Sequence, residues 1–101
     1  MKRRNVVISG VGLVTPLGND TDSTWEALRN ARSGIRELTS FDAAFPVRVG
    51  GQVLEFDPAP YVTDRKVLKV VMRDTLFAMA AARKAIGDAA LSPGDVDPVR
   101  F

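Results

Sequence analysis

One long segment, from Asp64 to Leu91, constrains the fold of this chain more than any other part of the sequence. It contains no proline and is rich in Ala, Leu, Met, Arg and Lys, which favour α-helix. We predict a helix over this segment, which could break near Asp74. Its apolar residues recur at steps of three and four and form one stripe, made of Leu68, Met72, Leu76, Met79, Ala82, Ile86 and Ala90.

The middle of this predicted helix is apolar or small on every side, since residues 76–82 read LFAMAAA. A helix with no polar side packs between two layers of protein. We therefore expect an interior helix in a layered α/β body, and 101 residues are hardly enough to cover both of its sides. The loop that follows leads to Val99-Arg100-Phe101, which is typical of the approach to another strand.

Two further patterns indicate β-structure. Residues 6–8 (Val-Val-Ile) form a β-branched run between turn residues, as in a central strand that is buried on both faces. Val47, Val49 and Val53 alternate around Gly50-Gly51, which indicates a short exposed hairpin or a bulged strand.

A second helix is expected from Ser23 to Arg32. Ser23 and Glu26 have the spacing of a capping box, in which each side chain bonds the backbone N–H of the other residue. Gly34 is the expected left-handed residue after the helix.

The chain has no Cys and no His, which removes several kinds of active site. It excludes Cys/His nucleophilic catalysis, Ser-His-Asp triads and zinc or copper sites built on imidazole or thiolate. The carboxylate pairs lie in predicted loops and are typical of turns, and the serines lack a G-x-S-x-G context. We therefore predict no catalytic residue, no metal site and no cofactor in these residues.

The N-terminus imitates a secretory signal, because Lys2-Arg3-Arg4 precedes the apolar run VVISGVGLVTPL. Gly10, Gly12 and Pro16 favour turns over a continuous helix in this run. The stretch without charged residues, 5–19, is shorter than the roughly 20 residues of a membrane span. We expect a cytoplasmic protein with no membrane span. The net charge of +2 also gives no reason to expect nucleic acid as a partner.

Gly10-Val-Gly12-Leu-Val-Thr15 partly matches the dinucleotide-binding fingerprint. Thr15 stands where the third glycine is needed, and Pro16 occupies the first helical turn. The interpretation that we favour is a turn that glycine permits, without nucleotide binding.

The interval from Arg65 to Lys84 concentrates positive charge. It holds six cations against Asp74 alone, so that it carries +5 while the rest of the chain sums to −3. Two readings remain open from this pattern: a solvated polar face, or a surface that binds anions.

The order of several short phrases resembles the N-terminal part of a β-ketoacyl-acyl-carrier-protein synthase, a condensing enzyme with the thiolase-like fold. These phrases are VVISGVGLVTPLGND, TWEAL, SGI, FD near residue 41, DRK near residue 64 and AAARKAIGDAAL. The resemblance implies a partial layered αβαβα fold, in which residues 1–101 are the N-terminal segment of the domain, incomplete at the C-terminus. This segment corresponds to about the first quarter of the usual family chain.

In that family a cysteine thiolate accepts the acyl chain, and two histidines assist the decarboxylation of malonyl-carrier protein. Those residues lie in segments of the family beyond Phe101. The resemblance therefore implies a role in fatty-acid or polyketide biosynthesis for a chain that alone is inactive.

The resemblance also implies a docking surface for acyl carrier protein, which bears its substrate as a phosphopantetheine thioester. Matching DRKVLK to the family motif places Lys66 and Lys69 at docking positions, with Arg65 beside them. Val70 stands where the family often has another base, so this basic patch is thinner. The family is usually dimeric, which implies a homodimer.

Two alternatives stay open at this point. The chain could be a noncatalytic module that docks the carrier protein or pairs with a ketosynthase subunit. It could also be a remnant that folds poorly and has no function.

Overall fold

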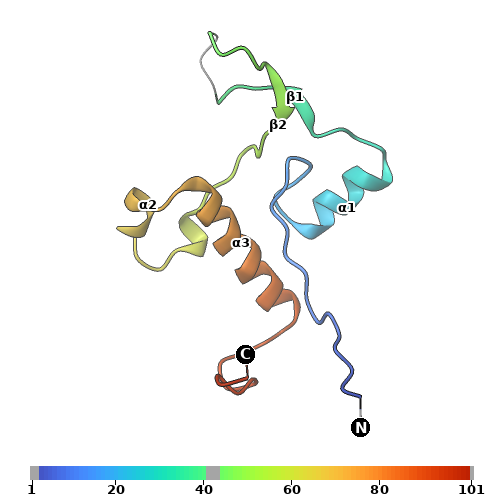
Figure 1. The fold of residues 1–101 in the computed structure, drawn as a ribbon, viewed down its shortest axis with the longest axis vertical. Coiled ribbons are helices and arrows are strands. Elements are labelled where there is room, and N and C mark those ends of the chain that lie inside the picture. The colour runs from blue at the N-terminus through green and yellow to red at the C-terminus, as the bar shows by residue number, and fades with distance from the viewer. Residues whose placement is uncertain (1–2, 41–43, 101) are drawn as a thin grey trace.

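The computed structural model describes residues 3–40 and 44–100. Figure 1 shows its order of elements, with α3 in the centre, α1 on one side, and α2 and η1 on the other. The elements are helix α1 (Thr21–Arg29), strands β1 (Ile35–Glu37) and β2 (Val49–Gly51), the 3-10 helix η1 (Ala59–Tyr61), and helices α2 (Val67–Val70) and α3 (Arg73–Asp88).

Helix α1 confirms the predicted second helix but begins at a different cap. Asp20 is the N-cap, and its Oδ1 accepts a hydrogen bond of 2.7 Å from the Ser23 N–H. Ser23 therefore lies inside the first turn, and the predicted capping box is wrong. The Glu26 carboxylate instead accepts a bond of 2.8 Å from the Asn30 side chain. Asp20 is favoured because its carboxylate combines a side-chain cap with a charge that suits the positive end of the helix.

Helices α1 and α3 both end in the same left-handed geometry, with alanine in place of glycine. Ala31 has φ 51° and Ala90 has φ 53°. At each end the next N–H donates to the carbonyl five residues back. These bonds run from Arg32 N to the Ala27 carbonyl (2.9 Å) and from Leu91 N to the Ile86 carbonyl (3.1 Å). The prediction that Gly34 ends α1 is thus wrong, because the closing turn forms three residues earlier.

Replacing Ala31 or Ala90 by glycine is expected to stabilise the fold by about 0.5–1 kcal/mol, because glycine has no Cβ to clash at positive φ. Ala78→Gly is the matched control. Ala78 is exposed in the middle of α3, where glycine should cost about 0.5–1 kcal/mol. Urea unfolding of a cooperatively folded polypeptide that carries these residues measures both effects. Destabilisation by Ala31→Gly or Ala90→Gly would contradict this account.

Strands β1 and β2 form an antiparallel pair, in which Ile35 lies opposite Gly51 and Glu37 opposite Val49. A bond of 2.7 Å from Leu38 N to the Arg48 carbonyl continues the ladder. The predicted strand near Val49 is confirmed, but Gly50 lies within the strand and not at a turn. Its partner strand had no clear alternating pattern in the sequence.

The long helix predicted over 64–91 is broken in two. Val71 and Met72 are extended, with ψ 137° and 153°, and separate α2 from α3 just before the expected position at Asp74. The β-branched residues Val67, Val70 and Val71 weaken helix propensity here. Asp74 then lies in the first turn of α3, where its charge suits the helix dipole.

The strand predicted at residues 6–8 is not formed. The segment is extended and pairs with no strand in the part of the chain that the structure describes, and Val6 is 94% exposed. A β-strand needs a neighbour for its backbone hydrogen bonds, and among residues 3–40 and 44–100 no strand pairs with this segment.

Further along, residues 10–12 cross α3 at close range. A Cβ on Gly12 would lie 2.5 Å from Ala85 N, and one on Gly10 would lie 2.6 Å from Ala89 N. Val11 N also donates a bond of 2.9 Å to the Asp88 carboxylate. These glycines thus permit backbone contact with a helix. The glycine turn predicted here is wrong, because residues 10–12 form no turn and neither glycine has positive φ.

The predicted apolar stripe of α3 is confirmed only in part, because Leu76 belongs to it and Ala80 does not. Leu76 and Ala80 are buried, whereas Met72 and Ile86 are exposed. The described residues bury only three apolar side chains, Ala27 together with Leu76 and Ala80. The chain is thus a mixed α/β arrangement in which one side of α3 is covered. The two-sided covering expected for an interior helix is absent from the described residues.

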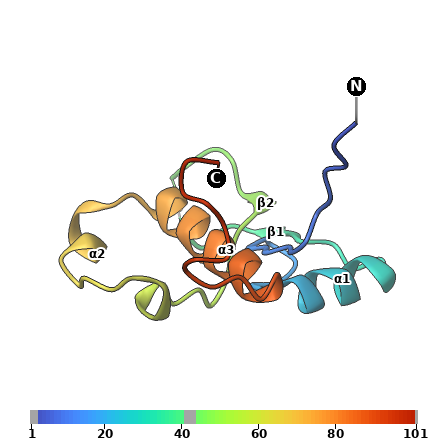
Figure 2. The same cartoon turned by 90° about the horizontal axis from the view of Figure 1, so that it is seen from below.

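The surface is large for the mass of the chain. It measures 8491 Å², against roughly 5,600 Å² for a compact protein of this size. The radius of gyration is 17.3 Å, against roughly 13 Å for a compact domain. Figure 2 shows the same openness from below, where the chain before its contact with α3 (dark blue) stands away from the helices. The described residues therefore form an open framework and do not enclose a core.

Candidate functional site

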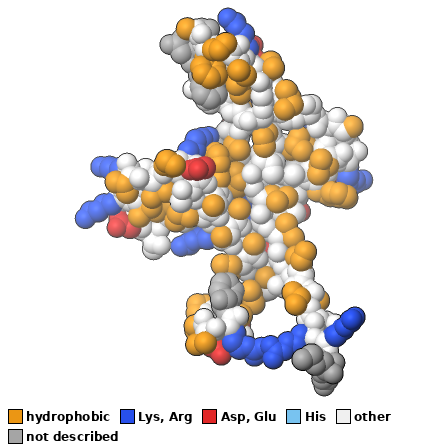
Figure 3. All heavy atoms as spheres, viewed as in Figure 1, with side chains coloured by type: hydrophobic (Ala, Val, Ile, Leu, Met, Phe, Trp, Pro, Cys, Tyr) orange, Lys and Arg blue, Asp and Glu red, His pale blue; other side chains and the backbone are white. Residues whose placement is uncertain are grey.

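The start of α2 carries a basic turn, in which Arg65 and Lys66 directly precede the helix and Lys69 lies within it. Arg65, Lys66 and Lys69 are all exposed. Asp64 begins this turn by accepting a bond of 2.9 Å from Lys66 N. None of the three cations forms an ion pair with any residue that the structure describes. Figure 3 shows Lys and Arg side chains projecting at the left edge of the molecule, where Figure 1 places α2.

The other three cations of the basic interval make contacts within the fold. Arg73 donates to the Val53 carbonyl (3.2 Å), and its guanidinium lies 5.0 Å from the centre of the Phe77 ring. Arg83 donates to the Thr63 hydroxyl (3.3 Å), and the Lys84 amine lies 5.4 Å from the centre of the Tyr61 ring. The +5 interval thus divides into three structural cations and three that are available to a partner.

An aromatic cluster connects the segment before α2 to α3. The rings of Phe56 and Tyr61 are stacked with centroids 6.2 Å apart. Phe56 also meets Phe77 of α3 edge to face, at 4.9 Å. Such pairs are favourable beyond their buried area. Together with Arg73 and Lys84, these rings hold η1 against α3. Helix α2 therefore begins a few residues after an anchored segment.

A polar groove lies between the N-terminal segment, the start of α1 and α3. It is lined by Val11, Asp20, Thr21, Asp22, Tyr61, Lys84 and Asp88. Hydrogen bonds from the Ser23 side chain and backbone, with a smaller attraction to Lys84, lower the pKa of the Asp20 carboxyl. Two carboxylates of this groove have structural roles. Asp20 caps α1, and Asp88 accepts the hydrogen bond from Val11 N. Across residues 3–40 and 44–100, no group of carboxylates has the arrangement of a metal site.

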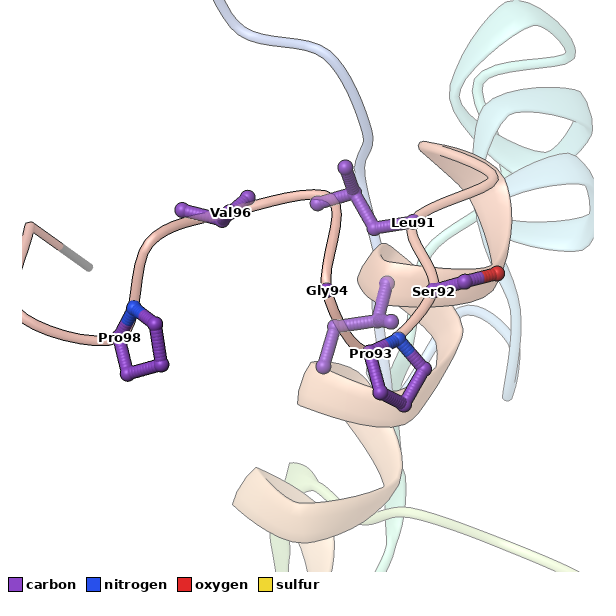
Figure 4. A pocket seen from close by; sticks show the side chains of 7 residues that line it. Leu91, Ser92, Pro93, Gly94, Val96 and Pro98 are labelled. Carbon is purple, nitrogen blue, oxygen red and sulfur yellow. The ribbon is translucent and has the colours of Figure 1, made fainter.

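A second hollow lies beside the loop that follows α3 (Figure 4). Ile86, Leu91, Pro93, Val96 and Pro98 line it, and Ser92 contributes the only hydroxyl. The hollow is apolar and holds no pair of groups for acid–base or nucleophilic chemistry.

No helix among the described residues has the length and hydropathy needed to cross a bilayer.

The comparisons with known proteins agree with the resemblance found in the sequence. Residues 3–101 match the family "Beta-ketoacyl synthase, N-terminal domain". The chain belongs to this family.

The matching relatives include proteins named as acyl-carrier-protein synthases and as polyketide synthase subunits. The chain is 40% identical to 3-oxoacyl-[acyl-carrier-protein] synthase 2 of Coxiella burnetii, over 99% of this chain and 24% of that protein. It is 42% identical to the tetracenomycin polyketide synthase ketoacyl synthase beta subunit of Streptomyces glaucescens, over 91% of this chain and 22% of that protein. Among solved structures, the ishigamide ketosynthase/chain length factor matches with a TM-score of 0.77 at 32% identity, covering 94% of this chain and 24% of that one.

These matches also show how much of its relatives' length this chain covers. The chain spans about a quarter of the length of its relatives. Its arrangement is part of a ketosynthase N-terminal fold, which explains why α3 has the composition of an interior helix but is covered on one side only.

Residue types located the basic interval, and the family resemblance selected three of its six cations. Arg65, Lys66 and Lys69 were the predicted site residues, and the structure places all three on one exposed turn. The structural roles of Arg73, Arg83 and Lys84 were missed. Only Arg73 had a local signal, because Phe77 follows it at i+4, whereas Lys84 lies far along the chain from Tyr61.

Proposed function

We propose that these residues are the N-terminal segment of a β-ketoacyl synthase domain and supply its scaffold and a docking surface for acyl carrier protein. The enzyme would condense an acyl thioester with malonyl-carrier protein. A cysteine thiolate would first take the acyl group from its carrier, which leaves as the free thiol. Loss of CO₂ from malonyl-carrier protein would give a carbanion that attacks the acyl carbonyl and releases the cysteine thiolate. The cysteine and two histidines for these steps would belong to polypeptide outside residues 1–101, so that this chain alone would be inactive.

The exposed turn of α2 supports the docking part of this proposal. Arg65, Lys66 and Lys69 are exposed and unpaired among the described residues, while the neighbouring cations are held by the fold. Charges placed this way steer an acidic partner and add modestly to its affinity. We further propose that the protein acts in the cytoplasm as a homodimer, with a carrier-bound phosphopantetheine thioester as its substrate.

Charge reversal on α2 tests the docking surface. Lys66→Glu/Lys69→Glu is expected to raise the Kd for acyl carrier protein by about tenfold or more at low salt, because attraction becomes repulsion. Titration of labelled carrier protein against the full-length polypeptide that carries these residues measures this change.

Arg3→Glu/Arg4→Glu is the matched control for that titration. It changes the net charge equally at two exposed residues of the N-terminal segment, far along the chain from α2. Equal weakening by both double variants, or none by the lysine variant, would contradict a docking site on α2.

A ketosynthase-pairing role is the second candidate. It is favoured by the 42% identity to a protein named as a ketoacyl synthase beta subunit and by the likeness to a ketosynthase/chain length factor structure. Reading the encoded sequence past Phe101 separates the two candidates. A cysteine and two histidines in frame would support the condensing enzyme, and their absence from a long continuation would support the noncatalytic partner.

A further inference from the structure

The outer face of α2 carries one apolar side chain among its cations. Lys66, Lys69 and Val70 are spaced i, i+3 and i+4, so they project from the same side of this single turn. Val67 and Leu68 are half-buried, whereas Val70 is 81% exposed. Met72, just after the turn, is 69% exposed. Two cations and an exposed valine thus share one small surface.

We propose that this face binds its acidic partner through a mixed contact, in which Val70 packs against an apolar side chain of the partner while Lys66 and Lys69 engage the surrounding carboxylates. This inference rests on the proposed docking function and specifies the surface that the partner must present. The unpaired cations require that surface to be acidic. The exposed valine beside them favours an apolar residue within that surface.

The two kinds of contact contribute differently to binding. Charges at the edge of an interface mainly accelerate encounter, and salt screens them. A desolvated apolar contact near the centre slows dissociation and depends little on salt. Val70 lies one turn from Lys66 and next to Lys69, so a partner held by both lysines would cover it. The salt dependence of binding can therefore separate the contribution of the valine from that of the lysines.

Val70→Ser provides the direct test. In the full-length polypeptide that carries these residues, the substitution is expected to raise the Kd for acyl carrier protein about fivefold, at both low and high salt. Lys69→Gln is expected to raise the Kd at low salt, with an effect that fades at high salt. Val70→Ile keeps the apolar surface and should retain the affinity of the unchanged protein.

Val99→Ser is the matched control, because Val99 is 92% exposed and lies in the C-terminal loop, away from α2. It should leave the Kd unchanged. The melting temperatures of the Val70 variants should also match that of the unchanged protein, which separates lost binding from lost folding.

The outcomes distinguish this inference from the function on which it rests. If Val70→Ser leaves the Kd within twofold of its original value while the lysine variants weaken binding, the docking surface stands and the apolar contact is wrong. If neither the lysine nor the valine variants change the Kd, the docking function itself is wrong. If Val70→Ser acts only at low salt, its effect is not that of an apolar contact, and the inference is again overturned.

Discussion

Gly12→Ala is expected to destabilise the fold by about 3 kcal/mol, since a single methyl group would be forced into the backbone of α3. The added Cβ would overlap the Ala81 carbonyl oxygen and lie 2.5 Å from Ala85 N and 2.9 Å from the Lys84 Cβ. Helix backbone cannot rotate away as a side chain can. The N-terminal segment would have to move off α3, which would also break the bond from Val11 N to Asp88.

Gly87→Ala is the control for this effect within the same helix. A Cβ at Gly87 would meet nothing within 4 Å, so the substitution should stabilise α3 by about 0.5–1 kcal/mol. Urea unfolding of a cooperatively folded polypeptide that carries these residues should therefore move in opposite directions for the two variants. A Gly12→Ala midpoint at or above that of the unchanged protein would refute the close approach as a constraint.

The isolated 101-residue chain is expected to aggregate or to unfold without a cooperative transition. The described residues bury three apolar side chains, while Val6, Val7 and Ile8 are left almost fully in water. An uncovered β-branched segment of this kind promotes association with other chains. So small a core cannot offset the conformational entropy of ordering the chain.

Calorimetry and light scattering on the purified chain test this expectation. Calorimetry should show a broad or absent heat-absorption peak, and scattering should show species larger than a monomer. A longer polypeptide that carries the same residues should show a sharp transition, because its additional layers would cover α3 and residues 6–8. A monodisperse 101-residue monomer with a cooperative transition would overturn the prediction.

Much of the local structure could be predicted from the sequence. The helical segment after Asp64, the interruption before Asp74 and the strand at Val49 are all present. The family was also identifiable from ordered phrases spread over the chain, and the match over residues 3–101 confirms it. These features depend on residue types and spacings within one or two turns, or on the order of short phrases along the chain.

Other features required the path of the whole chain. The sequence could not show that residues 6–8 would lack a partner strand, because pairing depends on segments distant in sequence. It assigned Gly12 to a turn, because nothing local indicates that residue 85 of a helix lies against it. Periodicity placed Met72 and Ile86 in one buried stripe with Leu76, yet α3 leaves those two exposed and buries Ala80 beside Leu76.

The docking surface shows the same division. Residue types alone determined that the interval from Arg65 to Lys84 is strongly basic, and family resemblance selected Lys66 and Lys69 within it. Only the tertiary structure decided that Arg73 and Lys84 stack on aromatic rings while the cations of α2 remain open to a partner. Charge is a property of each residue and can be read from the sequence. Whether that charge is available depends on which rings and carbonyl groups the folded chain brings within a few ångströms of it.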